Sequence, residues 1–363
     1  MRNFHFTILL PFVFIQGIFF QSVNGQQIDN INKSPKYPNY KLKVEKLLEF
    51  GAGDLTKEKY LLGRAADIAL DSHGNVYICD DISAEVKKFD KNRKYIKTIG
   101  SGKGRGPGEF ITPRRIQLDE NDNLFVLDFE LRRLTQFDRN GNFLRTLPFN
   151  KMKPGEFAIR NGLVYVLGFR LYKTPPIQII DLNTGQMIGA FGDRTADSLL
   201  VARVGSTGSL TFKNKEIIYY ADYYPYRISS FSADGNPLFS FSRHAPFIKP
   251  PKQIPSQRRP GTFYVRGQGG IRGIGILNPN YLMVLIDKLD GEEQKHNLFV
   301  DIFDQSGTWL LTIPLAKYFN ISWTRHIIAD KKGNVYLTSD DPFPHVEKFS
   351  IDLRDENGNV IMQ

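Results

Sequence analysis

The chain of 363 residues has a single cysteine, Cys79, so an intrachain disulfide is impossible. Its stability must come from the packing of side chains rather than from covalent cross-links. Cys79 lies in the apolar run 76–79, which predicts a small buried side chain rather than a reactive thiol. Beyond residue 20 no run is long and apolar enough to span a bilayer, so no transmembrane segment is expected.

The motifs of common catalytic loops are also missing. The glycine-rich segment 102–108 lacks the Ser or Thr that follows the Lys of a phosphate-binding loop, and it leads into a predicted strand rather than a helix. We therefore interpret it as a connection between structural units. Nothing in the chain resembles the strained turn that presents a nucleophilic serine. No reaction class can be assigned from such motifs.

The N-terminus has the pattern of a secretory leader. Residues 4–20 are almost wholly apolar and precede a short polar stretch with small residues at Val23 and Gly25. This pattern predicts a signal peptide over residues 1–25, cleaved before Gln26. No cysteine follows the apolar run at this point, so we expect a secreted or periplasmic protein that is not a lipoprotein.

Two segments, residues 65–99 and 113–147, align without a gap at a spacing of 48 residues. A period of about 45 residues built from short strands and polar turns is typical of a β-propeller, in which each repeat forms one blade. Weaker copies follow. The sequence therefore predicts an all-β, six-bladed β-propeller with four-stranded antiparallel blades. The four weaker copies are residues 157–192, 210–241, 271–313 and 327–349.

The sixth copy ends before a fourth strand could form, and a candidate for that strand lies at the other end of the chain. Residues 43–50 resemble the blade-ending strand at 95–99. Because a free sheet edge is a liability, we expect the N-terminal strand to close the last blade. The predicted organisation is a signal peptide, an N-terminal extension over 26–42, and a single propeller domain over 43–363.

Several polar segments carry a family resemblance. Residues 102–113 (GKGRGPGEFITP), 119–128 and 136–141 (QFDRNG) resemble the NHL repeat and its six-bladed relatives among exported bacterial proteins. The resemblance implies a ring of six blades over nearly the whole chain. It implies less about function, because such rings are binding platforms, sensor domains or, in some relatives, metal-dependent lyases and lactone hydrolases.

The innermost strand of each blade lines the central channel, so positions at equal distances before the aligned turn should lie at one height. Five residues before that turn, the chain has Arg114, Arg272 and Arg325. One position further on, it has Asp67, Arg115 and His326. Clustered guanidinium groups require either an anionic ligand or balancing carboxylates, such as those of Asp67 and Glu156. The two interpretations are an anion-binding channel mouth and ion pairs that hold blades together.

Acidic residues also recur at the ends of the second strands. We interpret most of them as turn-forming side chains, of which one or two could face a ligand. These residues are Asp80, Asp128, Asp222 and Asp287.

Support for metal chemistry is poor. Zinc in the related lyases is held by histidines from several blades, and a catalytic zinc needs three protein ligands. Of the histidines after the leader, only His326 occupies a channel-lining position. No metal site or cofactor is predicted, although calcium would be the first metal to expect because oxygen ligands are plentiful. If the protein is an enzyme, Asp67, Glu156 and His326 are the candidates for metal ligation or acid–base work.

Residues 243–270 separate the fourth and fifth copies. They contain six basic residues, five prolines and no acid. Proline fixes φ and removes a hydrogen-bond donor, so we expect an extended arm that crosses one face of the ring rather than a central strand. The arm is either a plain loop or a contact surface for an acidic partner.

A tyrosine-rich segment covers residues 219–227. Strand alternation should bury about half of it, and the rest would lie on a loop beside Arg227. Stacking on a ligand and packing between blades are both open interpretations. The candidate ligand-binding residues here are Tyr223, Tyr224, Tyr226 and Arg227.

The formal net charge is +10. A basic chain often binds nucleic acid, but predicted export favours an anionic small molecule, an acidic glycan or an acidic protein. We therefore expect an exported, monomeric and non-catalytic propeller that binds its ligand at the channel mouth. The alternatives are a metal-dependent hydrolase, lactonase or lyase, and a structural component of the cell envelope that uses the 243–270 arm.

Overall fold

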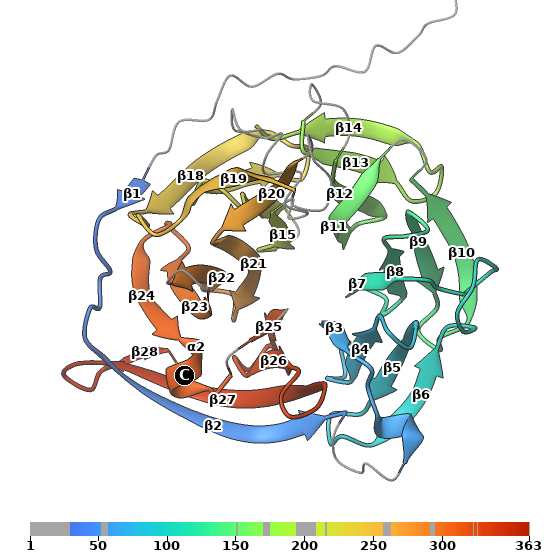
Figure 1. The fold of residues 1–363 in the computed structure, drawn as a ribbon, viewed down its shortest axis with the longest axis horizontal. Coiled ribbons are helices and arrows are strands. Elements are labelled where there is room, and N and C mark those ends of the chain that lie inside the picture. Colours follow the sequence, from blue (N-terminus) through green and yellow to red (C-terminus); the bar gives the residue numbers. More distant parts are fainter. Residues whose placement is uncertain are drawn as a thin grey trace, which may run out of the picture.

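The computed structural model describes residues 30–51, 57–149, 152–169, 175–193, 208–214, 216–256, 263–290, 295–321, 323–324 and 326–362. In this part of the chain, six sheets, each built on four antiparallel strands, surround a central channel like the blades of a propeller (Figure 1). The predicted all-β, six-bladed ring is thereby confirmed. The predicted signal peptide lies outside the described residues. None of the helices in the described ranges is long and apolar enough to cross a membrane.

In each of the first five blades the four strands follow one another in chain order, from the innermost strand at the channel to the outermost strand at the rim, without a crossover. Blade one has β3 (Ala65–Leu70), β4 (Val76–Asp80), β5 (Glu85–Phe89) and β6 (Tyr95–Ile99), with the short helix η1 (Glu58–Tyr60) before it. Blade two has β7 (Pro113–Leu118), β8 (Leu124–Asp128), β9 (Arg133–Phe137) and β10 (Phe143–Pro148). Blade three has β11 (Lys153–Arg160), β12 (Leu163–Phe169), β13 (Ile177–Asp181) and β14 (Met187–Phe191).

The second half of the ring is built in the same way. Blade four has β15 (Ser209–Phe212), β16 (Ile217–Ala221), β17 (Ile228–Ser232) and β18 (Pro237–Arg243). Blade five has β21 (Gly270–Leu277), β22 (Tyr281–Asp290), β23 (Lys295–Asp304) and β24 (Trp309–Pro314), followed by the one-turn helix α2 (Leu315–Tyr318). Blade six has β25 (Ile327–Ala329), β26 (Val335–Ser339), β27 (His345–Asp355) and β2 (Tyr40–Phe50), with β28 (Val360–Met362) paired to the end of β27.

The N-terminal strand closes the last blade, as predicted. Strand β2 pairs with β27 along its length, so the first and last strands of the ring lie side by side at its rim (Figure 1). Residues before β2 also bind the rim: β1 (Asn30–Asn32) adds a parallel strand to β18 of blade four. The side chain of Asn32 donates to the Gly307 carbonyl at 2.9 Å and accepts from the Trp309 amide at 3.0 Å, which links blades four and five.

The turns within the blades use a repeated aspartate. In blade one the Asp71 carboxylate accepts hydrogen bonds from the amide and the side-chain nitrogen of Asn75, at 2.9 and 2.8 Å. Gly74 in the same turn has a φ of 81°, which a residue with a Cβ rarely adopts. Gly74 therefore supplies the positive φ of this turn, and Asn75 supplies the hydrogen bonds to the carboxylate.

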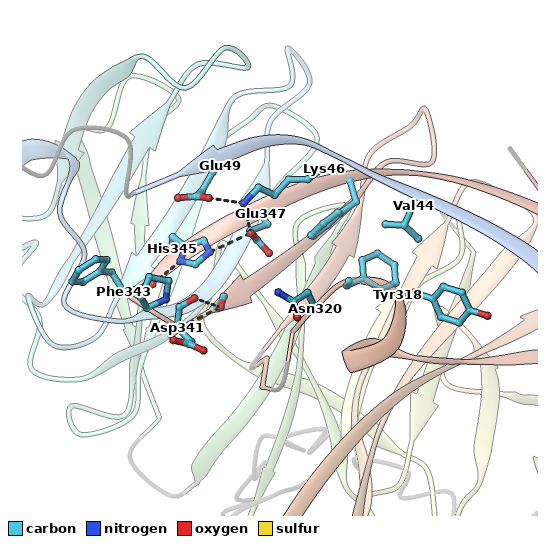
Figure 2. A pocket seen from close by; sticks show the side chains of 13 residues that line it. Val44, Lys46, Glu49, Tyr318, Asn320, Asp341, Phe343, His345 and Glu347 are labelled. Atoms are coloured by element: carbon cyan, nitrogen blue, oxygen red, sulfur yellow. Dashed lines mark hydrogen bonds and ion pairs between the residues drawn. The ribbon is translucent and has the colours of Figure 1, made fainter.

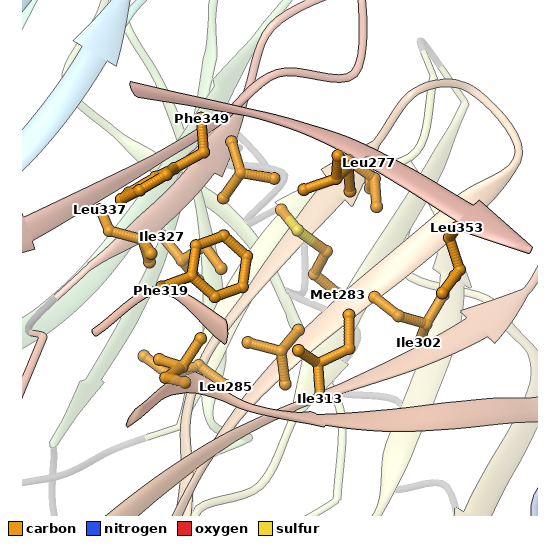
Figure 3. Packing of buried hydrophobic residues seen from close by; sticks show 14 of the residues in the cluster. Leu277, Met283, Leu285, Ile302, Ile313, Phe319, Ile327, Leu337, Phe349 and Leu353 are labelled. Carbon is orange, nitrogen blue, oxygen red and sulfur yellow. The ribbon is translucent and has the colours of Figure 1, made fainter. Parts of the chain in front are cut away.

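The hydrophobic core lies between adjacent blades, not in one central cluster. Figure 3 shows the seam between blades five and six, where Met283 and Leu285 of β22 face Phe349 and Leu353 of β27. Cys79 belongs to the seam between blades one and two, and burial raises its thiol pKa well above the usual value. Its predicted role as a small buried side chain is confirmed.

The basic insertion does not form the predicted extended arm. It folds into a separate two-stranded sheet of β19 (Lys249–Pro255) and β20 (Phe263–Gln268). The prolines are accommodated because the pairing skips residues 250 and 251 in a bulge between Lys249 and Lys252. A two-stranded sheet has only edge strands, in which proline is tolerated.

Candidate functional site

A cavity of about 380 Å³ occupies the centre of the ring, and the innermost strand of every blade contributes to its wall. Ten of the 19 residues that line it have aliphatic side chains. The polar exceptions include the three residues that the sequence offers for acid–base work. These are Asp67, Glu156 and His326.

Asp67 and His326 form one buried pair in this channel. His326 Nδ1 lies 3.1 Å from Asp67 Oδ1, and the other carboxylate oxygen accepts the Ile116 amide at 2.8 Å. Burial raises the Asp67 pKa to about 6 and lowers the His326 pKa to about 4. At pH 7 the imidazole is therefore neutral and the carboxylate is ionised.

Arg115 and Glu156 form a second pair, which joins blades two and three. Arg115 Nε donates to Glu156 Oε2 at 2.8 Å, and its Nη1 donates to the Arg114 carbonyl at 3.0 Å. Burial raises the Glu156 pKa, although the Arg115 charge opposes that effect. The Arg115 pKa is also raised: burial lowers it, but the charges of Glu156 and Asp67 outweigh this. The structure thus brings Asp67, Arg115 and His326, which the register argument assigned to one height, close to one another, and it adds Glu156 to the group.

At the end of the channel where the innermost strands begin, two arginines share one acid. Arg64 binds Asp81 through two hydrogen bonds, Nε to Oδ1 at 2.6 Å and Nη2 to Oδ2 at 2.5 Å. Arg114 of blade two adds an ion pair, with its Nε 3.0 Å from Asp81 Oδ2. The Asp81 carboxylate is fully buried, whereas the Arg114 side chain keeps 42% of its surface exposed.

Arg272 lies at the same end, on blade five. It is bound through Nε and Nη2 to Asp287, whose carboxylate is fully buried, yet 31% of the Arg272 side chain is exposed. The guanidinium carbon lies 5.9 Å from the Tyr223 ring and 5.6 Å from the Trp323 ring. His296 completes the group. Its Nδ1 lies 2.8 Å from Asp287 Oδ2, and the centroid of its ring lies 4.8 Å from that of Trp323. These contacts fix the orientation of a partly exposed cation.

The tyrosine-rich segment does not provide an exposed surface. Tyr223, Tyr226 and Arg227 are buried, and only Tyr224 is partly exposed. The Tyr226 hydroxyl donates to Asp301 at 2.7 Å, and Arg227 donates to Asp222 at 2.9 Å. The packing interpretation therefore applies to these three residues. Arg325 lies outside the described residues.

The acids at the ends of the second strands divide into two uses. Asp80 and Asp128 accept backbone amide hydrogen bonds from the loop before the innermost strand of their blade and from the loop after their own strand, as turn-forming residues should. Asp222 and Asp287 instead bind Arg227 and Arg272. Sequence reasoning missed Arg64, His296 and Trp323, because these residues lie outside the innermost strands.

Asp67, Glu156 and His326 do not form a compact set of metal ligands. Among the described residues, the one group of three such side chains with ligand atoms within 4.8 Å of one another lies elsewhere, in blade six. In the channel, the carboxylates of Asp67 and Glu156 are engaged by backbone amides, His326 and Arg115. The channel pairs are therefore better suited to proton transfer or hydrogen bonding than to metal ligation.

The opposite pKa shifts in the channel predict opposite pH responses for two variants. The raised Asp67 pKa stabilises the fold below about pH 4, and this contribution is lost as the pH rises through about 6. The lowered His326 pKa stabilises the fold above about pH 6.5, and this contribution is lost as the pH falls through about 4. From pH 7 to 4, we expect Asp67→Asn to become less stable relative to wild type and His326→Gln to become more stable.

Urea unfolding at several pH values measures both responses. Each relative change in unfolding free energy should be on the order of 1–3 kcal/mol, since one pKa unit corresponds to about 1.4 kcal/mol. Parallel pH profiles of the two variants and wild type would show that these groups do not titrate as described.

Comparison with known proteins supports the fold. Residues 23–161 match the family DUF5128, which is described as a 6-bladed beta-propeller. No curated protein sequence matches the chain. A Bacteroides fragilis protein described as exported by prediction superposes with a TM-score of 0.58 at 13% identity, covering 89% of this chain and 98% of that one.

Two further solved structures are similar. A Bacteroides vulgatus member of the DUF4221 family superposes with a TM-score of 0.58 at 12% identity, covering 89% of this chain and 100% of that chain. A Bacteroides thetaiotaomicron protein of unknown function gives 0.51 at 11% identity, covering 86% and 77%. At such identities the similarity shows a shared fold and carries no information on ligands.

Proposed function

We propose that the protein is a non-catalytic binding propeller that takes an anionic ligand at the mouth of its central channel. The observation that carries this proposal is the setting of Arg272. A fully buried carboxylate and two aromatic rings hold its guanidinium group, yet almost a third of the side chain faces solvent. A guanidinium that is held in one orientation loses little conformational entropy when it binds a carboxylate or phosphate.

Arg114 supports the proposal from the other side of the ring. It is also anchored to a buried carboxylate and is more exposed than Arg272. Arg64 also binds the Asp81 carboxylate. Asp81 would therefore keep a cationic partner when the Arg114 guanidinium group turns to a ligand. His296 and Trp323 add a hydrogen-bonding ring and an aromatic face beside Arg272. This combination fits an anionic sugar or another carboxylate or phosphate attached to a flat apolar body.

A thermal-shift screen tests the proposal. We expect acidic sugars, citrate and phosphate to raise the melting temperature of wild type, while neutral glucose does not. Arg114→Gln combined with Arg272→Gln should abolish the shift. The control is Arg354→Gln, which removes an arginine of strand β27 in blade six that is paired with Asp352. Equal shifts in wild type and the double variant would contradict an anion site at these arginines.

We also propose that the protein is exported. The leader-like pattern of residues 1–25 supports this, and so does the exported description of the similar Bacteroides fragilis protein. N-terminal sequencing of protein from the periplasm or medium should begin at Gln26. Retention of the full chain in the cytoplasm would contradict export.

A second candidate function is hydrolysis or elimination inside the channel. The neutral His326 imidazole, held 3.1 Å from the Asp67 carboxylate in the cavity wall, has the arrangement of a general base and its orienting acid. Turnover of an ester or lactone that disappears in His326→Gln would favour this function. The absence of turnover across such a panel would favour binding alone.

A further inference from the structure

Blade six contains a pair of carboxylates that face each other across two strands. Glu49 of β2 lies directly opposite Glu347 of β27 in the register of the antiparallel pair. Like charges at directly opposed positions are destabilising unless a cation lies between them. The two strands that carry them come from opposite ends of the chain, so this site exists only when the ring is closed.

A β-bulge places a lysine beside this pair. Residues three apart normally point to opposite faces of a strand, but the register shifts between Lys46 and Leu48. The extra residue brings Lys46 and Glu49 to the same face. Lys46 Nζ lies 2.8 Å from Glu49 Oε2 and 2.7 Å from Glu347 Oε1, so it occupies the position between the carboxylates that a cation requires. Its side chain is 49% exposed and can swing out into solvent.

A buried histidine completes the group. His345 Nδ1 lies 2.5 Å from the Phe343 carbonyl oxygen and must donate its proton there, because a carbonyl cannot donate. This contact directs Nε2 towards Glu347, 3.5 Å from Oε1. A histidine that ligates a metal usually donates its other ring N–H to a carbonyl or carboxylate in this way.

We propose that Glu49, His345 and Glu347 bind one divalent zinc ion, which takes the place of the Lys46 ammonium group. Their ligand atoms already lie within 4.8 Å of one another. Ligands of a tetrahedral zinc ion are about 3.4 Å apart, so small side-chain rotations close the set. Imidazole nitrogen and carboxylate oxygen are both ordinary zinc ligands. This site is independent of the anion site at the channel mouth.

A pocket of about 590 Å³ adjoins the three side chains (Figure 2). Its wall includes Asn320 and Asp341 and also the ring of Tyr318. Three protein ligands leave one position of a tetrahedral zinc ion open, and the pocket offers room there for water or a small ligand. The arrangement is that of an accessible metal site rather than a closed structural one.

Zinc titration of the full chain after dialysis against a chelator tests the proposal. Calorimetry and metal analysis should show one zinc ion per chain at this site. Glu49→Gln and His345→Gln should each lower the affinity by at least roughly tenfold, because even residues that only orient zinc ligands contribute about 10- to 100-fold. Lys46→Met should raise the affinity, because it removes the competing ammonium group.

The matched control is His73→Gln, which removes an exposed histidine that also lies near a carboxylate, that of Asp122. It should leave zinc binding unchanged. If His345→Gln fails to fold, Glu49→Gln and Lys46→Met still decide the question, since both residues are partly exposed. No stoichiometric zinc, equal affinity in Glu49→Gln and wild type, or no gain in Lys46→Met would overturn the proposal.

Discussion

Replacing Arg243 by methionine should destabilise the fold by about 3–5 kcal/mol, the usual cost of leaving one member of a buried ion pair alone. Arg243 ends strand β18 of blade four and donates through Nε to Asp301 of blade five. Both side chains are buried, and the guanidinium group lies 4.6 Å from the Trp309 ring. Without it, the Asp301 carboxylate would accept hydrogen bonds only from the Tyr226 and Thr312 hydroxyl groups.

Urea unfolding of wild type and two variants measures this effect. The control is Arg354→Met, which removes a partly exposed arginine paired with Asp352 and should cost about 0–1 kcal/mol. The double variant Arg243→Met with Asp301→Asn should cost less than the sum of the single variants, because the unpaired charge is gone. A loss below about 1 kcal/mol for Arg243→Met would show that the pair does not hold blades four and five together.

Phe50→Ala should lower the free energy of unfolding by a similar amount, about 3–5 kcal/mol, although Phe50 belongs to the N-terminal strand β2 at the rim of the ring. Phe50 ends strand β2 and is 1% exposed. The centroid of its ring lies 6.2 Å from that of Phe89 in blade one and 6.4 Å from that of Tyr336 in blade six. The side chain therefore fills the seam at which the ring closes.

Leu47→Ala is the matched control for this prediction, because Leu47 lies on the same strand and is 41% exposed. It should change the unfolding free energy by no more than about 0.5 kcal/mol. If the two substitutions have equal small effects, strand β2 does not close the ring.

The ring itself could be predicted because the first two blades repeat with a spacing of 48 residues and keep the aspartate of each inner turn. That repeat also fixes height along the channel, which is why Asp67, Arg115 and His326 could be assigned to one level. The position of an arginine along the channel does not indicate which acidic side chain it pairs with. Asp81, which binds both Arg64 and Arg114, lies in a loop that the strand pattern does not place.

Other features depend on pairing that only the folded chain defines. The opposition of Glu49 and Glu347 requires both the closure of the ring and a bulge that shifts the register by one residue. The basic insertion forms a hairpin because its adjacent prolines fall within a second bulge. The tyrosines at 223 and 226 follow a strand, so alternation could not indicate that both are buried.

The most direct test of the proposed function is a calorimetric titration of the best anion from the thermal-shift screen at low and high salt. We expect one binding site per chain and weaker binding at high salt. The variant that combines Arg114→Gln with Arg272→Gln should bind roughly 100-fold more weakly, because each of the two lost charged contacts contributes about 1.4 kcal/mol. The same affinity in wild type and that variant would contradict an anion site at the channel mouth.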